Sequence, residues 1–279
     1  MLNILERWRH DRRERAALDE RRPSDRRPED HVVSLVAPAS FAAERYRVLR
    51  YTIEQMHKDA DIRVLAITSP TVGDGKTTTA VNLAGALAQA PDARVLLVDA
   101  DLRRGQVQAT LALCDSYEPG LAETIVDPNV SLTKVIRRCP EFNLSVLPAG
   151  RCPAAPYEAL KSPRLAELVH EMRRDYDYVV LDTAPLLPVP DSRMLTKCVD
   201  GFLMVVGAHK TGRRLVEEAF DIIDPAKVLG VVFNGDDSPI SSYSSYGYGL
   251  YAVQHSNNGG SRERLWRRWI GRKARRVAS

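Results

Sequence analysis

Residues 63–79 read RVLAITSPTVGDGKTTT, and this stretch decides the fold. The apolar run over 63–69 is rich in branched side chains, which predicts a buried strand. The Ala- and Leu-rich segment over 77–89 predicts a helix. A glycine-containing loop connects the two, and a strand, such a loop and a helix in this order are typical of a phosphate-binding P-loop.

The residue types of this loop suit a polyphosphate. Gly73 and Gly75 let the backbone curl until its N–H groups face phosphate oxygens. Lys76 brings a cation to the terminal phosphates, and the Thr77 hydroxyl is a typical Mg²⁺ ligand. Pro70 stands where the usual pattern has its first glycine. We expect the nucleotide to contact Gly73, Asp74, Gly75, Lys76, Thr77 and Thr78.

An alternation of strands and helices surrounds this loop. Apolar runs predict strands over 94–99, 143–148, 178–182, 202–206 and 228–233. Helical patterns lie over 41–57, with Ser40 as the N-cap, over 157–174 and over 211–224. Continuous apolar strands separated by helices indicate a mainly parallel sheet with helices on both faces. The predicted fold is therefore α/β, of the P-loop NTPase type.

Two acidic motifs stand where such a fold binds its ligands, at the carboxyl ends of strands. The first, VLLVDADLR over 95–103, places Asp99 and Asp101 on one side of an extended chain and adds Arg103 for phosphate charge. The second, VVLDTAP over 179–185, ends a strand with Asp182. A Walker B carboxylate at this position holds Mg²⁺ directly or through water. Together with the P-loop, the two motifs predict ATP hydrolysis or phosphoryl transfer.

The net charge of +4 is distributed unevenly. Residues 261–279 hold seven Arg and one Lys against one Glu, so the body of the chain is mildly acidic. The hydrophobic content of 44% fits a globular protein, and no apolar run approaches the roughly 20 residues that cross a bilayer. We expect a disordered charged arm over 1–37, a P-loop domain over 38–238, a Tyr-, Ser- and Gly-rich tail over 239–260 and a basic amphipathic tip over 261–279.

The basic tip has the pattern of a helix that lies on an anionic membrane. Leu265, Trp266, Trp269 and Ile270 form one apolar stripe, with arginines around it over 262–276. A disordered tail without a role is the alternative. We expect no nucleic-acid ligand, because the body of the chain is acidic.

These motifs resemble those of the bacterial tyrosine kinases (BY-kinases) of capsule and exopolysaccharide biosynthesis. The resemblance covers about residues 38–251, where VLLVDADLR corresponds to the family's Walker A′ motif. Three further features carry it: an ExxRxxR pattern at Glu44, Arg47 and Arg50, an LPAG segment over 147–150, and a cluster of tyrosines at Tyr243, Tyr246, Tyr248 and Tyr251.

The resemblance implies a stand-alone cytoplasmic kinase domain that binds ATP and Mg²⁺. Thr77, Asp101 and Asp182 would hold the metal, and Asn234 would touch adenine. The catalytic residues would be Lys76, Asp99, Asp101 and Arg103, with Asp99 receiving or orienting the tyrosine hydroxyl proton.

The resemblance also implies how this kinase would be used. The tyrosine cluster would be its autophosphorylation site, entering the active site of a neighbouring subunit. Glu44, Arg47 and Arg50 would lie in contacts of a ring-like homo-oligomer. The partner would be a membrane-embedded activator of the polysaccharide co-polymerase type, which places the kinase in the cytoplasm, peripheral to the inner membrane. Its function would be to regulate exopolysaccharide polymerisation and export.

Other interpretations of the same residues remain. A partition- or Min-type ATPase switch would share the P-loop and a basic C-terminal helix, but that class has a signature Lys where this chain has Thr71. An ATP-binding scaffold with degraded catalysis is disfavoured by the intact lysine and aspartates. The tyrosine cluster could be a linker, and Glu44 could pair with Arg47 on an exposed helix.

Overall fold

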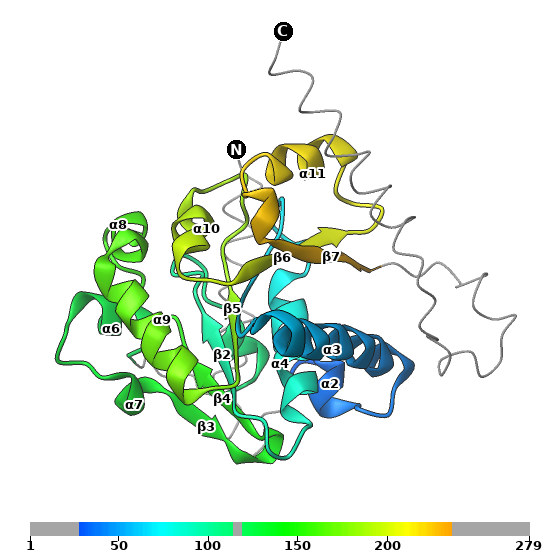
Figure 1. Cartoon of the computed structure of the whole chain (residues 1–279), viewed down its shortest axis with the longest axis horizontal. Helices are drawn as coiled ribbons and strands as arrows, with labels where there is room; N and C mark the ends of the chain where they lie inside the picture. The colour runs from blue at the N-terminus through cyan, green and yellow to red at the C-terminus, as the bar shows by residue number, and fades with distance from the viewer. Residues whose placement is uncertain (1–27, 114–118, 236–279) are drawn as a thin grey trace, which may run out of the picture. The chain divides into compact units, whose positions relative to one another are not determined.

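A seven-stranded sheet forms the centre of the structure (Figure 1). The computed structural model describes residues 28–113 and 119–235. The strands are β1 (Val64–Thr68), β2 (Val95–Asp99), β3 (Arg137–Cys139), β4 (Leu144–Leu147), β5 (Tyr178–Asp182), β6 (Gly201–Gly207) and β7 (Val228–Asn234). They lie in the order β3-β4-β2-β5-β1-β6-β7, and only the β3–β4 pair is antiparallel. The predicted α/β fold with a mainly parallel sheet is confirmed.

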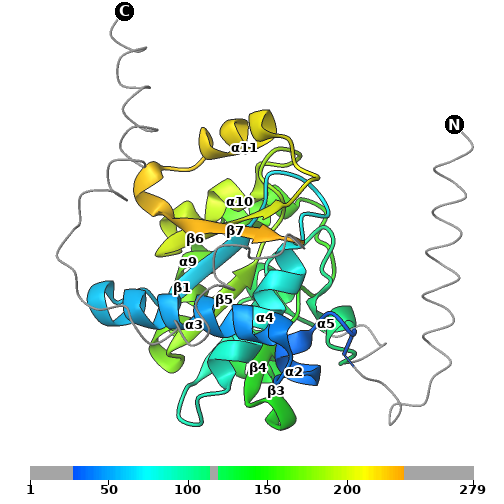
Figure 2. The ribbon, with the colours of Figure 1, turned by 90° about the vertical axis from the view of Figure 1, so that its right-hand side faces the viewer.

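Helices cover both faces of the sheet. One face carries α2 (Val33–Val36), α3 (Phe41–Ala60), α4 (Lys76–Ala88) and α5 (Val107–Thr110). The other carries α6 (Leu121–Val126), α7 (Leu132–Val135), α8 (Pro156–Lys161), α9 (Pro163–Asp175), α10 (Asp191–Met194) and α11 (Arg213–Phe220). Short 3₁₀ turns span Pro140–Phe142, Leu195–Lys197 and Pro225–Lys227. Figure 2 shows α3 and α4 packed side by side on the first face.

The central strands are buried on both faces, which explains their unbroken apolar sequences. In β1, Val64 and Ala66 pack into one core cluster and Leu65 and Ile67 pack into the other. Such strands suit the middle of a parallel sheet covered by helices. The same burial fixes the carboxyl ends of β1, β2 and β5 next to one another.

Some predicted element boundaries differ from the observed ones. The helix predicted over 41–57 begins as expected, since Ser40 Oγ accepts a hydrogen bond from Ala43 N at 3.1 Å, but it continues to Ala60. The helix predicted over 157–174 is two helices, because Pro163 favours extended backbone at Ser162, which then caps α9. The short edge strand β3 was not predicted, because three residues carry little pattern.

The boundary predicted at residue 37 is wrong for the last part of the arm. Val32 and Ser34 are buried against α4, and Ser34 N donates a hydrogen bond to Asn82 Oδ1 at 2.8 Å. Asn82 Nδ2 in turn donates to His31 O at 3.0 Å. The apolar run over 32–36 therefore belongs to the core, although charged residues precede it.

The remaining predicted segments lie outside the described residues. These are the arm over 1–27, the tyrosine-rich tail over 239–260 and the basic tip over 261–279. Across 28–113 and 119–235, every helix is too short or too polar to cross a bilayer.

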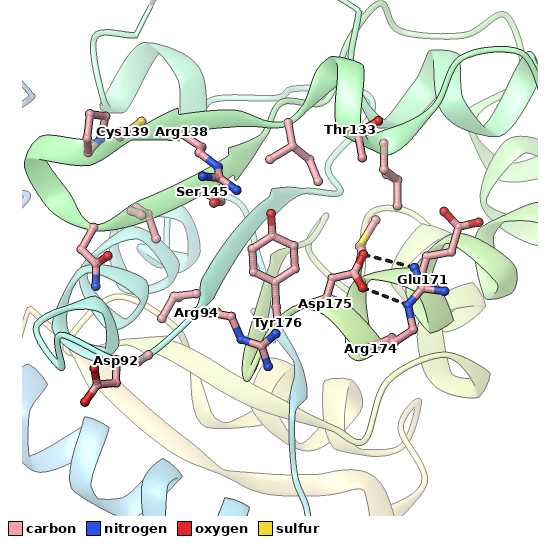
Figure 3. Close-up of a pocket in the computed structure, with 18 of the residues that line it drawn as sticks. Asp92, Arg94, Thr133, Arg138, Cys139, Ser145, Glu171, Arg174, Asp175 and Tyr176 are labelled. Carbon is pink, nitrogen blue, oxygen red and sulfur yellow. Dashed lines mark hydrogen bonds and ion pairs between the residues drawn. The ribbon is translucent and has the colours of Figure 1, made fainter.

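A cleft of about 850 Å³ opens at the amino-terminal ends of β2 and β4 (Figure 3). Tyr176 stands in it, with Arg138 of β3 and the Arg174–Asp175 ion pair nearby. None of the predicted site residues lines this cleft. The predicted site lies at the opposite, carboxyl ends of the strands.

The side chain of Asn82 should hold residues 28–37 against α4. We expect Asn82→Ala to lower the free energy of unfolding by about 2 kcal/mol, because the buried backbone N–H of Ser34 loses its acceptor and the carbonyl oxygen of His31 loses its donor. Hydrogen–deuterium exchange should rise over 28–37. Asn129→Ala, at an exposed turn, is the control. Equal exchange in both variants would contradict this account.

Candidate active site

The P-loop connects β1 to α4, and its two glycines adopt left-handed backbone conformations. Gly73 has φ 81° and Gly75 has φ 92°, and residues other than glycine rarely adopt such values. A Cβ atom at Gly75 would also collide with the Asn234 amide. Gly75 is the N-cap of α4, so the loop leads directly into a helix N-terminus. This is the backbone arrangement expected for phosphate binding.

The Asp74 side chain is turned into the protein, although we predicted it as a nucleotide contact. The residue is fully buried, and its Oδ2 accepts hydrogen bonds from Thr71 N at 2.9 Å and Thr71 Oγ1 at 3.0 Å. Its Oδ1 accepts a hydrogen bond from Thr211 Oγ1. The carboxylate therefore organises the loop, and contact with a phosphate would have to come from the backbone of Asp74.

Lys76 and Thr77 meet the two predicted metal-binding aspartates. Lys76 Nζ lies 3.0 Å from Asp101 Oδ2 and 3.6 Å from Asp182 Oδ1. Thr77 Oγ1 donates a hydrogen bond to Asp182 Oδ2 at 2.6 Å. Burial lowers the pKa of Lys76, but Asp182 and Asp101 outweigh it, so the net pKa is raised and the ammonium stays charged.

Asp99 is buried beside this cluster. It pairs in register with Asp182 across β2 and β5, and its Oδ2 accepts a hydrogen bond from Val107 N at 3.0 Å. Burial, assisted by the neighbouring charge of Asp182, raises the pKa of Asp99 to about 8. Asp99 can therefore hold a proton near neutral pH and exchange it under ordinary conditions.

The residues fit Mg²⁺. Asp182 Oδ1 is buried and has no hydrogen-bond partner among the described atoms, and burial raises the pKa of Asp182. A carboxylate in that state is stabilised by a cation. In the described ranges no three His, Cys, Asp or Glu side chains form a metal cluster. Mg²⁺ commonly uses one or two carboxylates together with phosphates and waters, so Thr77, Asp101 and Asp182 suffice.

Arg103 has a partner that the sequence did not indicate. Its Nε and Nη2 donate to Asp191 Oδ2 and Oδ1, at 2.6 and 3.1 Å. Asp191 is 1% exposed and begins α10, so the pair ties the loop after β2 to the chain after β5. No spacing in the sequence relates these two positions. The role of Arg103 toward phosphate stays a prediction.

Asn234 reaches the P-loop, together with two residues that sequence reasoning missed. Asn234 Nδ2 donates to Asp74 O at 3.1 Å from the end of β7. Lys210 Nζ donates to Gly73 O at 2.7 Å, and Thr211 bonds to Asp74 as described above. Both residues lie in the connection from β6 to α11, where polar residues carry no recognisable motif.

The ExxRxxR residues do not meet the P-loop. Arg47 pairs with Glu44 and donates to Pro38 O at 2.6 Å. Arg50 bonds to Glu54 at 2.6 Å and to Ala86 O, near the carboxyl end of α4, at 2.9 Å. These partners lie within the chain, so contacts of Glu44, Arg47 and Arg50 with another subunit stay a prediction. The four tyrosines lie outside the described residues.

Asp99 should make the stability of the nucleotide- and Mg²⁺-free protein depend on pH. Because its folded pKa is raised from 3.8 to about 8, the folded state binds the proton more tightly than the unfolded state. The stabilisation is complete below about pH 4 and is lost as the pH rises through 8. Urea unfolding should show that Asp99→Asn loses less stability than wild type between pH 5 and 8; parallel pH curves would refute the assignment.

Comparisons with known proteins show which family the chain belongs to. A family model described as an AAA domain matches residues 62–212, which include the P-loop and both acidic motifs. The chain is 34% identical over 224 residues to the tyrosine-protein kinase YwqD of Bacillus subtilis, covering 80% of this chain and 92% of that protein. It is also 34% identical over 234 residues to the succinoglycan biosynthesis transport protein ExoP of Rhizobium meliloti, covering 79% of this chain but only 29% of ExoP.

A solved structure is also similar to this chain in three dimensions. The kinase domain of the Escherichia coli tyrosine kinase ETK matches with a TM-score of 0.69 and 30% identity, covering 83% of this chain and 91% of that domain. The partition- or Min-type alternative is less supported than the kinase interpretation. The chain belongs to the family of bacterial tyrosine-protein kinases, built on a P-loop AAA domain.

Proposed function

We propose that this chain is an ATP-dependent protein-tyrosine autokinase that regulates exopolysaccharide or capsule polymerisation and export. One observation carries the proposal: Lys76, Thr77, Asp101 and Asp182 meet beside the glycine loop, with Lys76 Nζ 3.0 Å from Asp101. A cation, a hydroxyl and two carboxylates in this place suit ATP with Mg²⁺. Family membership supports tyrosine as the acceptor.

Nucleotide binding uses the loop and the lysine. The loop N–H groups and the N-terminus of α4 hold the phosphates. Lys76 turns from Asp101 to the terminal phosphate, which its raised pKa permits because the ammonium remains charged. Mg²⁺, held by Thr77, Asp101 and Asp182, supplies neutralisation of the phosphate charge when it is bound.

Transfer of the phosphoryl group uses Asp99. The tyrosine oxygen bonds to the γ-phosphorus while the bond from the γ-phosphorus to the β–γ bridging oxygen breaks, which leaves ADP and phosphotyrosine. Asp99 orients the phenol and receives its proton; an ordinary phenol has a pKa near 10. The raised pKa of Asp99 makes it a stronger base than a solvated carboxylate. Positioning and charge neutralisation supply most of the rate.

The rest of the chain supports proposals for the substrate and for the partners. Tyr243, Tyr246, Tyr248 and Tyr251 are the acceptors, phosphorylated by a neighbouring subunit of a homo-oligomer. A membrane-embedded activator of the polysaccharide co-polymerase type stimulates the kinase; ExoP, named as a succinoglycan biosynthesis transport protein, supports this link. The tip over 262–276 holds the kinase at the inner face of the membrane.

Autophosphorylation should require Lys76 and the tyrosine cluster. Incubation of the full chain with ATP and Mg²⁺, with and without a candidate activator segment, should give phosphotyrosine. Lys76→Met should reduce the signal at least about 100-fold, because the phosphates lose their cation. A variant with phenylalanine at positions 243, 246, 248 and 251 should give no signal. ATP hydrolysis without phosphotyrosine under any condition would reject the kinase proposal.

Mixing these two inactive variants tests transfer between subunits. Lys76→Met retains the acceptors, and the phenylalanine variant retains the active site. Phosphotyrosine should return on the Lys76→Met chain in the mixture. Each variant alone is the control, and a silent mixture of folded proteins would argue for transfer within one chain.

The basic tip should bind anionic lipid. The full chain should float with phosphatidylglycerol vesicles more than with neutral phosphatidylcholine vesicles, since arginines attract anionic headgroups. Trp266→Ala with Trp269→Ala should reduce flotation, whereas Trp8→Ala serves as the matched control. Equal flotation of all proteins would remove the membrane role of the tip.

A further inference from the structure

Thr211 bonds to a buried carboxylate inside the P-loop, although it belongs to another loop. Its Oγ1 donates a hydrogen bond to Asp74 Oδ1 across 137 positions of sequence. Asp74 is fully buried, so this oxygen cannot exchange Thr211 for water without rearrangement. Leaving a buried carboxylate without one of its hydrogen-bond donors costs free energy. The local structure is therefore strongly influenced by this bond.

Asp74 joins three separate segments at one point. Its Oδ2 is bound by Thr71 within the P-loop, its Oδ1 by Thr211 of the β6–α11 connection, and its carbonyl oxygen by Asn234 of β7. The β6–α11 connection is seated closely on the loop. Lys210 Nζ donates to Gly73 O at 2.7 Å, and a Cβ atom at Gly207 would lie 3.0 Å from Asp74 Oδ1.

The position of Asp74 between two glycines makes these bonds important. Gly73 and Gly75 both have left-handed φ values, and glycine backbone moves easily among many conformations. The glycines permit the curled loop, but they do not by themselves select it. The side chain between them is held by donors on both of its oxygens, and the loop conformation follows from that side chain.

We propose that Thr211 is a positioning residue of the nucleotide site, which holds the P-loop through Asp74 in the conformation that binds phosphate. Thr211 therefore sets nucleotide affinity and leaves the phosphoryl-transfer step unchanged. This inference rests on the proposed ATP-binding function, but its main test is nucleotide binding, which needs no kinase activity.

Two substitutions separate the hydroxyl from the shape of the side chain. Thr211→Val keeps the branched shape and removes the donor, whereas Thr211→Ser keeps the donor. If the loop is in its binding conformation only part of the time, the apparent Kd rises in inverse proportion to that fraction. We expect nucleotide binding about tenfold weaker in Thr211→Val and within about twofold of wild type in Thr211→Ser.

The experiment is a titration of the full chain with a fluorescent ADP analogue and Mg²⁺. Thr196→Val is the matched control, because Thr196 is also half-buried and its hydroxyl also donates a hydrogen bond, to Arg193 O. Without nucleotide, hydrogen–deuterium exchange over 69–77 should be faster than wild type in Thr211→Val, and it should be unchanged in Thr211→Ser and Thr196→Val. The KM for ATP in autophosphorylation should rise with kcat unchanged. If Thr211→Val does not fold, Thr211→Ala, which also lacks the donor, replaces it.

Several results would overturn the inference. The inference fails if Thr211→Val binds nucleotide as tightly as wild type. It also fails if Thr211→Ser binds as weakly as Thr211→Val, or if Thr196→Val loses as much nucleotide affinity as Thr211→Val. A fall in kcat at unchanged KM would also overturn it. The proposed function fails separately, since wild-type protein that binds no nucleotide would reject ATP binding itself.

Discussion

Like charges are forced together at the carboxyl edge of the sheet. Asp99 and Asp182 are paired in register on β2 and β5, and Asp101 follows two residues later. All three are buried, and burial raises the pKa of Asp99 and of Asp182. Lys76 lies against Asp101 and Asp182 and offsets part of this cost. Because the backbone of the sheet holds these carboxylates close together, their negative charge has to be neutralised by cations.

This requirement couples the ligands of the proposed kinase to one another. If Lys76 turned toward a nucleotide phosphate, Asp101 and Asp182 would lose the ammonium that compensates them. Held by the same aspartates, a divalent cation would supply that compensation and would also neutralise the phosphates. Nucleotide and metal binding should therefore favour each other. The metal compensates the aspartates that Lys76 leaves, and the nucleotide draws Lys76 away from the carboxylates that the metal needs.

The sequence predicted those parts of the structure whose cause is local. The strand over 64–68, the glycine loop and the aspartates at strand ends follow from periodicity and residue type within short windows. The missed features depend on distant contacts. Arg103 meets Asp191 across 88 positions and Thr211 meets Asp74 across 137, and neither pair has a spacing rule. The attachment of residues 32–36 was missed because its buried partner, Asn82, lies on α4.

The orientation of Asn234 has a consequence for the base of the nucleotide. Its amide nitrogen donates to Asp74 O, and within residues 28–113 and 119–235 no donor reaches its side-chain oxygen. The amide nitrogen carries a second N–H, so Asn234 can offer a base both a donor and an acceptor. At the predicted adenine contact, its oxygen would accept a hydrogen bond from the exocyclic amine of the base. One side chain would then anchor the end of β7 to the P-loop and also meet the base of the nucleotide.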